Sequence, residues 1–141
     1  MSRYRTQPRN DGSIQWVQLK KRFPQFTAHW NRGCYIFRGT LHPTETSPFY
    51  ELRIIYAVDN YPKVYVLAPE INQNAPHRYK DNSLCLFHPK NFDWTNQCLL
   101  SNYTIPWTAA WLRFYEIWLN TGEWFADEEP HDTEMLLSHA A

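Results

Sequence analysis

Apolar and polar side chains alternate between residues 50 and 58, and this alternation constrains the fold more than any other feature of the sequence. The apolar members occupy every second position: Tyr50, Leu52, Ile54, Tyr56 and Val58. A period of two predicts a β-strand with one buried face. A turn-forming segment at residues 59–62 and a valine-rich run at residues 63–67, which stops before Pro69, follow directly. Because such short links join antiparallel neighbours, we expect an antiparallel β-meander.

A further strand and a first helix precede this pair. Residues 34–41 are mostly aromatic and β-branched, which predicts a strand that ends at His42-Pro43. Ser13 can cap a short amphipathic helix over residues 14–22, because its hydroxyl can accept a backbone N–H of the first turn. Pro24 prevents this helix from continuing.

The last helix has the strongest pattern in the chain. Pro106 suits a first helical turn, and Gly122 suits a C-terminal cap. An aromatic stripe recurs at i, i+4, i+7 and i+11: Trp107, Trp111, Phe114 and Trp118. We expect this stripe to pack in the core against the sheet, with Arg113, Glu116 and Asn120 on the opposite side.

Between the meander and this helix, residues 69–103 show no sustained periodicity, and we expect at most short helical turns near residues 94–100. An irregular segment of this length inside one domain usually carries function. The length of the chain suits one domain with a single core. We therefore predict one α+β domain over residues 13–125, a flexible lead-in at residues 1–12 and an acidic tail at residues 126–141 that frays.

Charge, hydropathy and cysteine content exclude several classes of protein. Fourteen Lys and Arg balance fourteen Asp and Glu, so no overall field recruits nucleic acid. No run approaches the roughly 20 apolar residues of a membrane span, and the N-terminus lacks the apolar run of a signal peptide, so we expect a cytoplasmic protein with no membrane partner. Three cysteines at irregular spacings argue against a disulfide framework and favour free thiols.

Cys85 is the candidate nucleophile. It lies in the long loop between two leucines that can anchor the backbone, with His77 and His88 close in sequence. An anchored polar loop can present sulfur to a partner, and a nearby imidazolium favours the reactive thiolate. An isolated cysteine also suits core packing, so the local pattern alone leaves both readings open. Cys34 falls in a predicted strand and is expected to be buried, and Cys98 is the second candidate for reactivity.

Several motifs around Cys85 fall in the register of a known family. Tyr61-Pro62 precedes a strand that ends at proline, and Ala75-Pro76-His77-Arg78-Tyr79 aligns with a His-Pro-Asn-x-Tyr motif. Asp81-Asn82-Ser83-Leu84-Cys85-Leu86 aligns with Asp-Gly-Ser-Ile-Cys-Leu at the same Tyr-to-Cys spacing, and Trp94 matches a tryptophan that follows the cysteine. Residues 13–120 thus resemble the ubiquitin-conjugating enzyme family. The resemblance implies a UBC-like fold: an N-terminal helix, an antiparallel meander, a long active-site loop and a C-terminal aromatic-rich helix.

The sequence of the last predicted helix resembles one group within this family more specifically. The run from Ile105-Pro106-Trp107-Thr108 to Thr121-Gly122 is similar to the bacterial ubiquitin-conjugating-like proteins of CBASS antiphage operons. In that family the domain works with, or is fused to, an activating domain, and it joins the C-terminus of a cyclic-nucleotide synthase to an amine. Since the chain has no room for an adenylating domain, it resembles a stand-alone conjugating subunit, with an activating enzyme as a further partner.

The resemblance also implies roles for individual residues. Cys85 would carry the acyl group of a cyclic-nucleotide synthase or a ubiquitin-like protein as a thioester. His77 stands where the family has asparagine and would either donate a hydrogen bond to an oxyanion or accept a proton. Asp81 would orient the amine or His77, and Ala75 replaces the family's first histidine. We expect no cofactor.

Three other functions stay open. A UBC-like binding module would bind partners without chemistry, although a cysteine in register argues against it. A cysteine hydrolase would pair Cys85 with a histidine from a distant segment, His29 or His42. A tetrahedral zinc site is a weaker alternative, because the four candidate ligands contain only one close pair. These ligands are His77, Cys85, His88 and Cys98.

Overall fold

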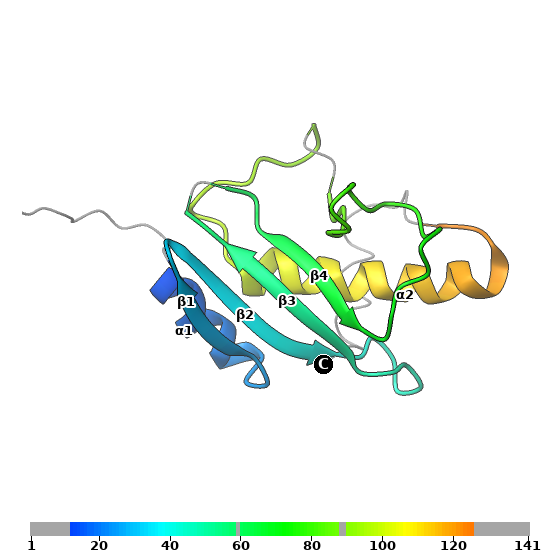
Figure 1. The fold of residues 1–141 in the computed structure, drawn as a ribbon, viewed down its shortest axis with the longest axis horizontal. Coiled ribbons are helices and arrows are strands. Elements are labelled where there is room, and N and C mark those ends of the chain that lie inside the picture. Colours follow the sequence, from blue (N-terminus) through cyan, green and yellow to red (C-terminus); the bar gives the residue numbers. More distant parts are fainter. Residues whose placement is uncertain (1–11, 59, 88–89, 126–141) are drawn as a thin grey trace, which may run out of the picture.

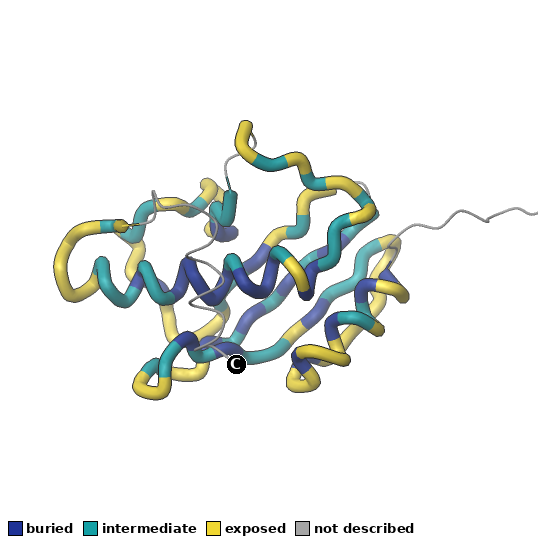
Figure 2. The backbone as a smooth tube through the Cα atoms, turned by 180° about the vertical axis from the view of Figure 1, so that it is seen from behind, coloured by how far each residue is buried: buried dark blue, intermediate teal, exposed yellow. Residues whose placement is uncertain are grey.

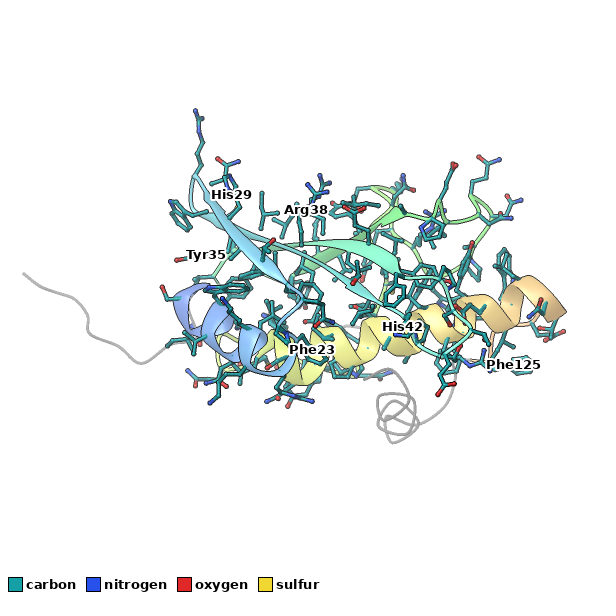
Figure 3. The ribbon with its side chains drawn as sticks, turned by 90° about the horizontal axis from the view of Figure 1, so that it is seen from below. Phe23, His29, Tyr35, Arg38, His42 and Phe125 are labelled. Carbon is teal, nitrogen blue, oxygen red and sulfur yellow. The ribbon has the colours of Figure 1, made fainter. Side chains whose placement is uncertain are left out.

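The computed structural model describes residues 12–58, 60–87 and 90–125. One antiparallel sheet has the strand order β1-β2-β3-β4, with bounds Thr27–Asn31, Cys34–Leu41, Tyr50–Tyr56 and Lys63–Ala68. Helix α1 (Gly12–Arg22) and helix α2 (Ile105–Thr121), which follows a π-helical turn η1 (Leu100–Thr104), cover the same face of this sheet (Figures 1 and 3). The prediction of an α+β fold with an antiparallel meander between two helices is confirmed.

Strand β3 holds the centre of the core, and its alternation is confirmed. Positions 50, 52, 54 and 56 are buried and positions 51, 53 and 55 are half-buried. The buried face packs against apolar side chains from both helices and from β2, including Leu19, Phe37 and Leu112. The other face carries no helix, and His29 and Arg38 project from it (Figure 3).

Strand β1 was not predicted. All five of its residues are exposed, so its sequence lacks the alternation that marks a half-buried strand. Arg32 and Gly33, both at positive φ, form the two-residue turn that pairs β1 with β2. The expectation that Cys34 is buried is wrong: Cys34 is half-buried, because it follows this turn directly and pairs with Asn31 at the end of the edge strand.

Helix α2 begins with Pro106 in its first turn and ends at Gly122 in the left-handed conformation, as predicted. The aromatic stripe is core only in part, since Trp111 is buried while Trp107, Trp118 and Phe114 are half-buried. Apart from Trp111, the buried face of α2 carries mostly smaller side chains, Ile105, Thr108, Ala109 and Leu112, together with Tyr115.

Glu116 was expected on the side of α2 that faces away from the core, and the structure corrects this expectation. Its carboxylate accepts hydrogen bonds from the hydroxyls of Tyr50, at 2.8 Å, and Ser47, at 2.9 Å. Burial, and then the Glu116 carboxylate, raise the pKa of Tyr50 well above its ordinary range. Glu116 therefore ties the helix to the start of β3 instead of facing solvent.

The long segment between β4 and η1 has no helix or strand in its described parts, residues 69–87 and 90–99, as expected from its lack of periodicity. Most of it is exposed or half-buried (Figure 2). The buried Gln15 side chain fixes its far end to α1, since its amide donates to Cys98 O at 2.8 Å and accepts from Leu100 N at 2.9 Å. Neither helix in the described part of the chain has the length and apolar character needed to cross a membrane.

Candidate active site

Cys85 lies on the second arm of a tight turn whose arms pair in antiparallel fashion. Arg78 and Leu84 form a β-bridge, Tyr79 N donates to Ser83 O and Cys85 N donates to His77 O, both at 2.9 Å. The backbone of Leu84 also donates to Val64 O of β4 at 2.9 Å, and the side chain of Leu84 is 4% exposed. The turn is therefore anchored on the core through Leu84, and Cys85, one residue on, is half-buried.

Two residues in left-handed conformations shape this turn. His77 has a φ of 60° and Asn82 a φ of 74°. Asn and His visit this region more readily than most other residues, and Asn82 stands where the related motif has glycine. The carbonyl of His77 accepts from Cys85 N and also from Trp111 Nε1, at 3.0 Å, so the first arm is fixed to helix α2.

The side chain of Tyr79 lies on the same side of the turn as the thiol of Cys85. Alternation along the two paired arms places residues 79 and 85 on the side opposite to Arg78 and Leu84, in diagonal positions that an aromatic side chain can span. A hydrogen bond to Cys85, and then burial, raise the pKa of Tyr79 to about 12. The Cys85 thiol itself lies 3.8 Å from Phe87 O, to which it donates. Sequence reasoning used Tyr79 only as a motif landmark, although its fixed spacing from Cys85 was a usable signal.

Asp81 holds the turn and does not approach the thiol in any described contact. Its carboxylate accepts from Lys63 Nζ at 2.7 Å, from Tyr65 OH at 3.1 Å, and from the Oγ and backbone N of Ser83 at 2.6 and 3.0 Å. The hydrogen bond from Lys63, and then those from Ser83, hold the pKa of Asp81 far below its usual range. We call Asp81, Lys63, Tyr65 and Ser83 the polar clamp.

The sequence suggested that the His77 ring acts beside Cys85, but the ring contacts Trp124. The residue is exposed, and its imidazole packs against Trp124 with ring centroids 5.1 Å apart. Trp124 in turn contacts Trp111 at 5.1 Å. The backbone of His77 therefore supports Cys85, while its side chain belongs to a contact with the segment after α2.

Beyond Cys85 the chain is held by aromatic rings. The aromatic cluster comprises Tyr61, Phe87, Phe92, Trp94, Tyr103 and Trp107. Trp107 of α2 lies at its centre, 5.2 Å from Phe87, 4.9 Å from Phe92 and 5.5 Å from Tyr103. This cluster was not predicted as a unit, because its members come from three separate segments.

The remaining candidates lie apart from this site. Cys98 is half-buried and accepts from Thr95 N at 3.5 Å, within its own turn. His29 is exposed on the edge strand, and His42 bonds to Thr44 O and packs against Phe49. Neither histidine contacts Cys85, which a Cys–His hydrolase would require.

A metal site also finds no ligand set in the described chain. No group of three or more His, Cys, Asp or Glu side chains suited to a metal ion occurs within residues 12–58, 60–87 and 90–125. Of the four candidate zinc ligands, His88 lies outside these described residues.

Comparison with known proteins places this architecture in a family. A comparison with the curated proteins finds no match. The family model described as Type II CBASS E2 protein matches residues 15–132, which include most of α1, the sheet, the Cys85 turn and α2. That match spans most of the sequence, and the chain belongs to the Type II CBASS E2 family.

Proposed function

We propose that this chain is a UBC-like conjugating subunit that carries an acyl group as a thioester on Cys85 and transfers it to an amine. The observation that carries the proposal is the placement of Cys85. Its backbone is fixed by the bond to His77 O and by the buried Leu84, while the residue itself is half-buried and its side chain lies on the same side of the turn as Tyr79. A rigid backbone with an accessible thiol is what an acyl carrier requires, because two large partners must reach the same sulfur in turn.

The chemistry proceeds in two steps. The Cys85 thiolate attacks the acyl carbon of an activated C-terminus, an acyl-adenylate or a thioester, and expels adenylate or the donor thiolate. An amine then attacks the thioester carbon, the C–N bond forms, the C–S bond breaks and the sulfur leaves as thiolate. The proton lost by the amine passes to solvent or to a nearby base. Both steps pass through a tetrahedral oxyanion, which needs a hydrogen-bond donor near the sulfur.

The family match supports a choice of partner. We propose that the acyl donor is the C-terminus of a cyclic-nucleotide synthase encoded with this protein in an antiphage system, and that an activating enzyme supplies the ATP-dependent step. The chain would then regulate or localise the synthase by attaching it to an amine, and a lysine is the most accessible amine of this kind on proteins.

The test is covalent loading. Purified chain is incubated with the synthase, the activating enzyme and ATP, and intact masses are compared before and after reduction. We expect a thiol-labile adduct on the wild type and on Cys98→Ala, and none on Cys85→Ala. Cys98→Ala is the matched control because both thiols are half-buried. An adduct that persists in Cys85→Ala would contradict the proposal.

A non-catalytic binding module is the second candidate function, and the His77 ring favours it. The imidazole packs against Trp124, so the thiol lacks the side chain that the related motif places at this position. A binding module predicts that Cys85→Ala binds the synthase as tightly as the wild type and that no adduct forms with an active activating enzyme.

A further inference from the structure

We propose that the Tyr79 hydroxyl is the hydrogen-bond donor to the oxyanion that forms when an amine attacks the Cys85 thioester. This inference rests on the proposed thioester function and assigns a catalytic residue to it. Tyr79 would touch the reacting atoms directly, since the oxyanion sits on the carbon bonded to Sγ.

The geometry places the hydroxyl at the correct end of the site. Tyr79 and Cys85 lie on the same side of the paired arms, and two backbone bonds, Tyr79 N to Ser83 O and Asn82 N to Tyr79 O, fix the base of the tyrosine at 2.9 Å each. The rise in the pKa of Tyr79, caused first by Cys85, agrees with this placement of the two side chains. When the sulfur of Cys85 bears an acyl group, the carbonyl oxygen of that group is two bonds from the sulfur. A small rotation of the tyrosine side chain would then bring its hydroxyl to this oxygen.

Five other polar side chains at or near this turn, those of Lys63, Tyr65, His77, Asp81 and Ser83, are engaged elsewhere. Lys63, Tyr65 and the Ser83 hydroxyl all donate to the Asp81 carboxylate, and a carboxylate cannot donate to an oxyanion. The His77 imidazole packs against Trp124. Tyr79 has no such competing partner, and its raised pKa, to about 12, keeps the hydroxyl protonated and able to donate at any pH at which the thioester is handled.

In the transfer step, the amine nitrogen forms a bond to the thioester carbon and the electron pair of the C=O moves to oxygen. The Tyr79 O–H donates a hydrogen bond to this oxygen without giving up its proton. The nitrogen loses its proton to solvent, the electron pair returns to reform C=O, the C–S bond breaks and Cys85 leaves as thiolate. The donor stabilises charge that exists only in the transition state and the intermediate, so its removal slows transfer more than it weakens binding.

The experiment compares Tyr79→Phe with Tyr61→Phe. Each change removes one hydroxyl from a tyrosine that is 50% exposed, and Tyr61 lies in the same region, 5.5 Å from Phe87. Cys85 is loaded chemically with a glycine-ended peptide thioester, which needs neither the synthase nor the activating enzyme. The thioester is isolated, and its discharge to free lysine and its hydrolysis are followed by intact mass at pH 7, 8 and 9.

We expect Tyr79→Phe to slow aminolysis and hydrolysis alike by roughly 10- to 100-fold at every pH, less than the effect of a fully buried donor because Tyr79 is half-exposed. Tyr61→Phe should discharge at the wild-type rate. Equal rates for Tyr79→Phe and wild type would overturn the inference. So would a defect that vanishes as the pH approaches the pKa of the amine, since that would place the hydroxyl on the amine proton. Because loading is chemical, a negative result here leaves enzymatic loading of Cys85 to be judged separately.

Discussion

The segments before and after Cys85 are both irregular, yet they are held by different forces. Before the cysteine, the Asp81 carboxylate accepts four hydrogen bonds, two of them from β4, and the arms of the turn pair through their backbones. After it, ring contacts around Trp107 fix Phe87 and Phe92 against α2. Directional polar bonds set the orientation of one side of the site, and apolar contact area sets the position of the other.

This difference separates two properties of the site. Hydrogen bonds need a donor–acceptor distance of about 2.7–3.2 Å and a nearly linear angle, so we expect the polar clamp to control where the thiol points. Ring contacts tolerate several arrangements and contribute mainly through buried area. We therefore expect damage to the aromatic cluster to reduce stability, and damage to the polar clamp to reduce reactivity with little loss of stability.

The largest effect should come from Trp107→Ala. Trp107 contacts three other rings, and its removal should lower the free energy of unfolding by about 2–3 kcal/mol, below the usual range for buried aromatics because it is half-buried. Trp118→Ala is the matched control on the same helix, since Trp118 is also half-buried but has one ring contact, to Tyr115 at 6.0 Å. Chemical denaturation measures both, and equal losses would show that the cluster adds nothing beyond general burial.

The next effect should come from Asp81→Asn, and it should appear in kinetics. The asparagine side chain is neutral, so it cannot form the ion pair with Lys63. It also replaces one carboxylate oxygen by an NH₂ group, which cannot accept a hydrogen bond from the donors around it. We expect chemical loading of Cys85 to slow by roughly tenfold as the turn loses its orientation. Asp93→Asn makes the same chemical change after the cysteine, outside the polar clamp, and should leave loading unchanged. Equal loading rates for the two variants would contradict a role of the polar clamp in orienting the thiol.

The polar clamp should also have a defined pH dependence. The pKa of Asp81 is lowered in the folded chain, so the folded state keeps this carboxylate charged at pH values where the unfolded chain takes up a proton. Its stabilisation is therefore complete above about pH 5 and declines as the pH falls below the ordinary Asp pKa near 4 toward the lower folded value. The difference in Tm between wild type and Asp81→Asn should be constant from pH 5 to 8 and shrink in acid. Because the pair with Lys63 is exposed, the difference should also shrink at high salt.

Most helices and strands of the molecule could be predicted, because each of these follows a local rule of sequence. The alternation at residues 50–58 identified β3, and Pro106 and Gly122 identified the ends of α2. Strand β1 could not be found in this way, because an edge strand that is exposed throughout has no apolar period. Glu116 was misplaced for a different reason, since its burial depends on two hydroxyls more than 60 residues away in the sequence.

Of the candidate site, only the sequence motif around Cys85 could be recognised from the sequence. The spacing around Cys85 identified the loop that carries it, whereas the tight turn and its two left-handed residues came from the structure. The partner of each side chain did not follow, because Asp81 meets Lys63 and His77 meets Trp124 only through the tertiary fold. Sequence therefore identified Cys85 as the candidate nucleophile, and the structure was needed to find the groups around it.

The smallest effect should come from position 82, where the turn depends on backbone conformation alone. Asn82 has a φ of 74°, and its side chain makes no hydrogen bond in the described structure. Asn82→Gly should change the free energy of unfolding by less than about 0.5 kcal/mol, because relief at positive φ is offset by a more flexible unfolded chain. Asn82→Ala should cost about 1 kcal/mol, since alanine adopts this left-handed region less readily than asparagine does.

Both substitutions at position 82 remove the same side-chain amide. The difference in stability between the two variants therefore measures the effect of backbone conformation alone. If Asn82→Ala also slows chemical loading of Cys85 while Asn82→Gly does not, the left-handed turn contributes to the orientation of the thiol together with the polar clamp. If the two variants are equally stable and load equally fast, backbone conformation is not what shapes this side of the site, and the Asp81 hydrogen bonds must hold the turn alone.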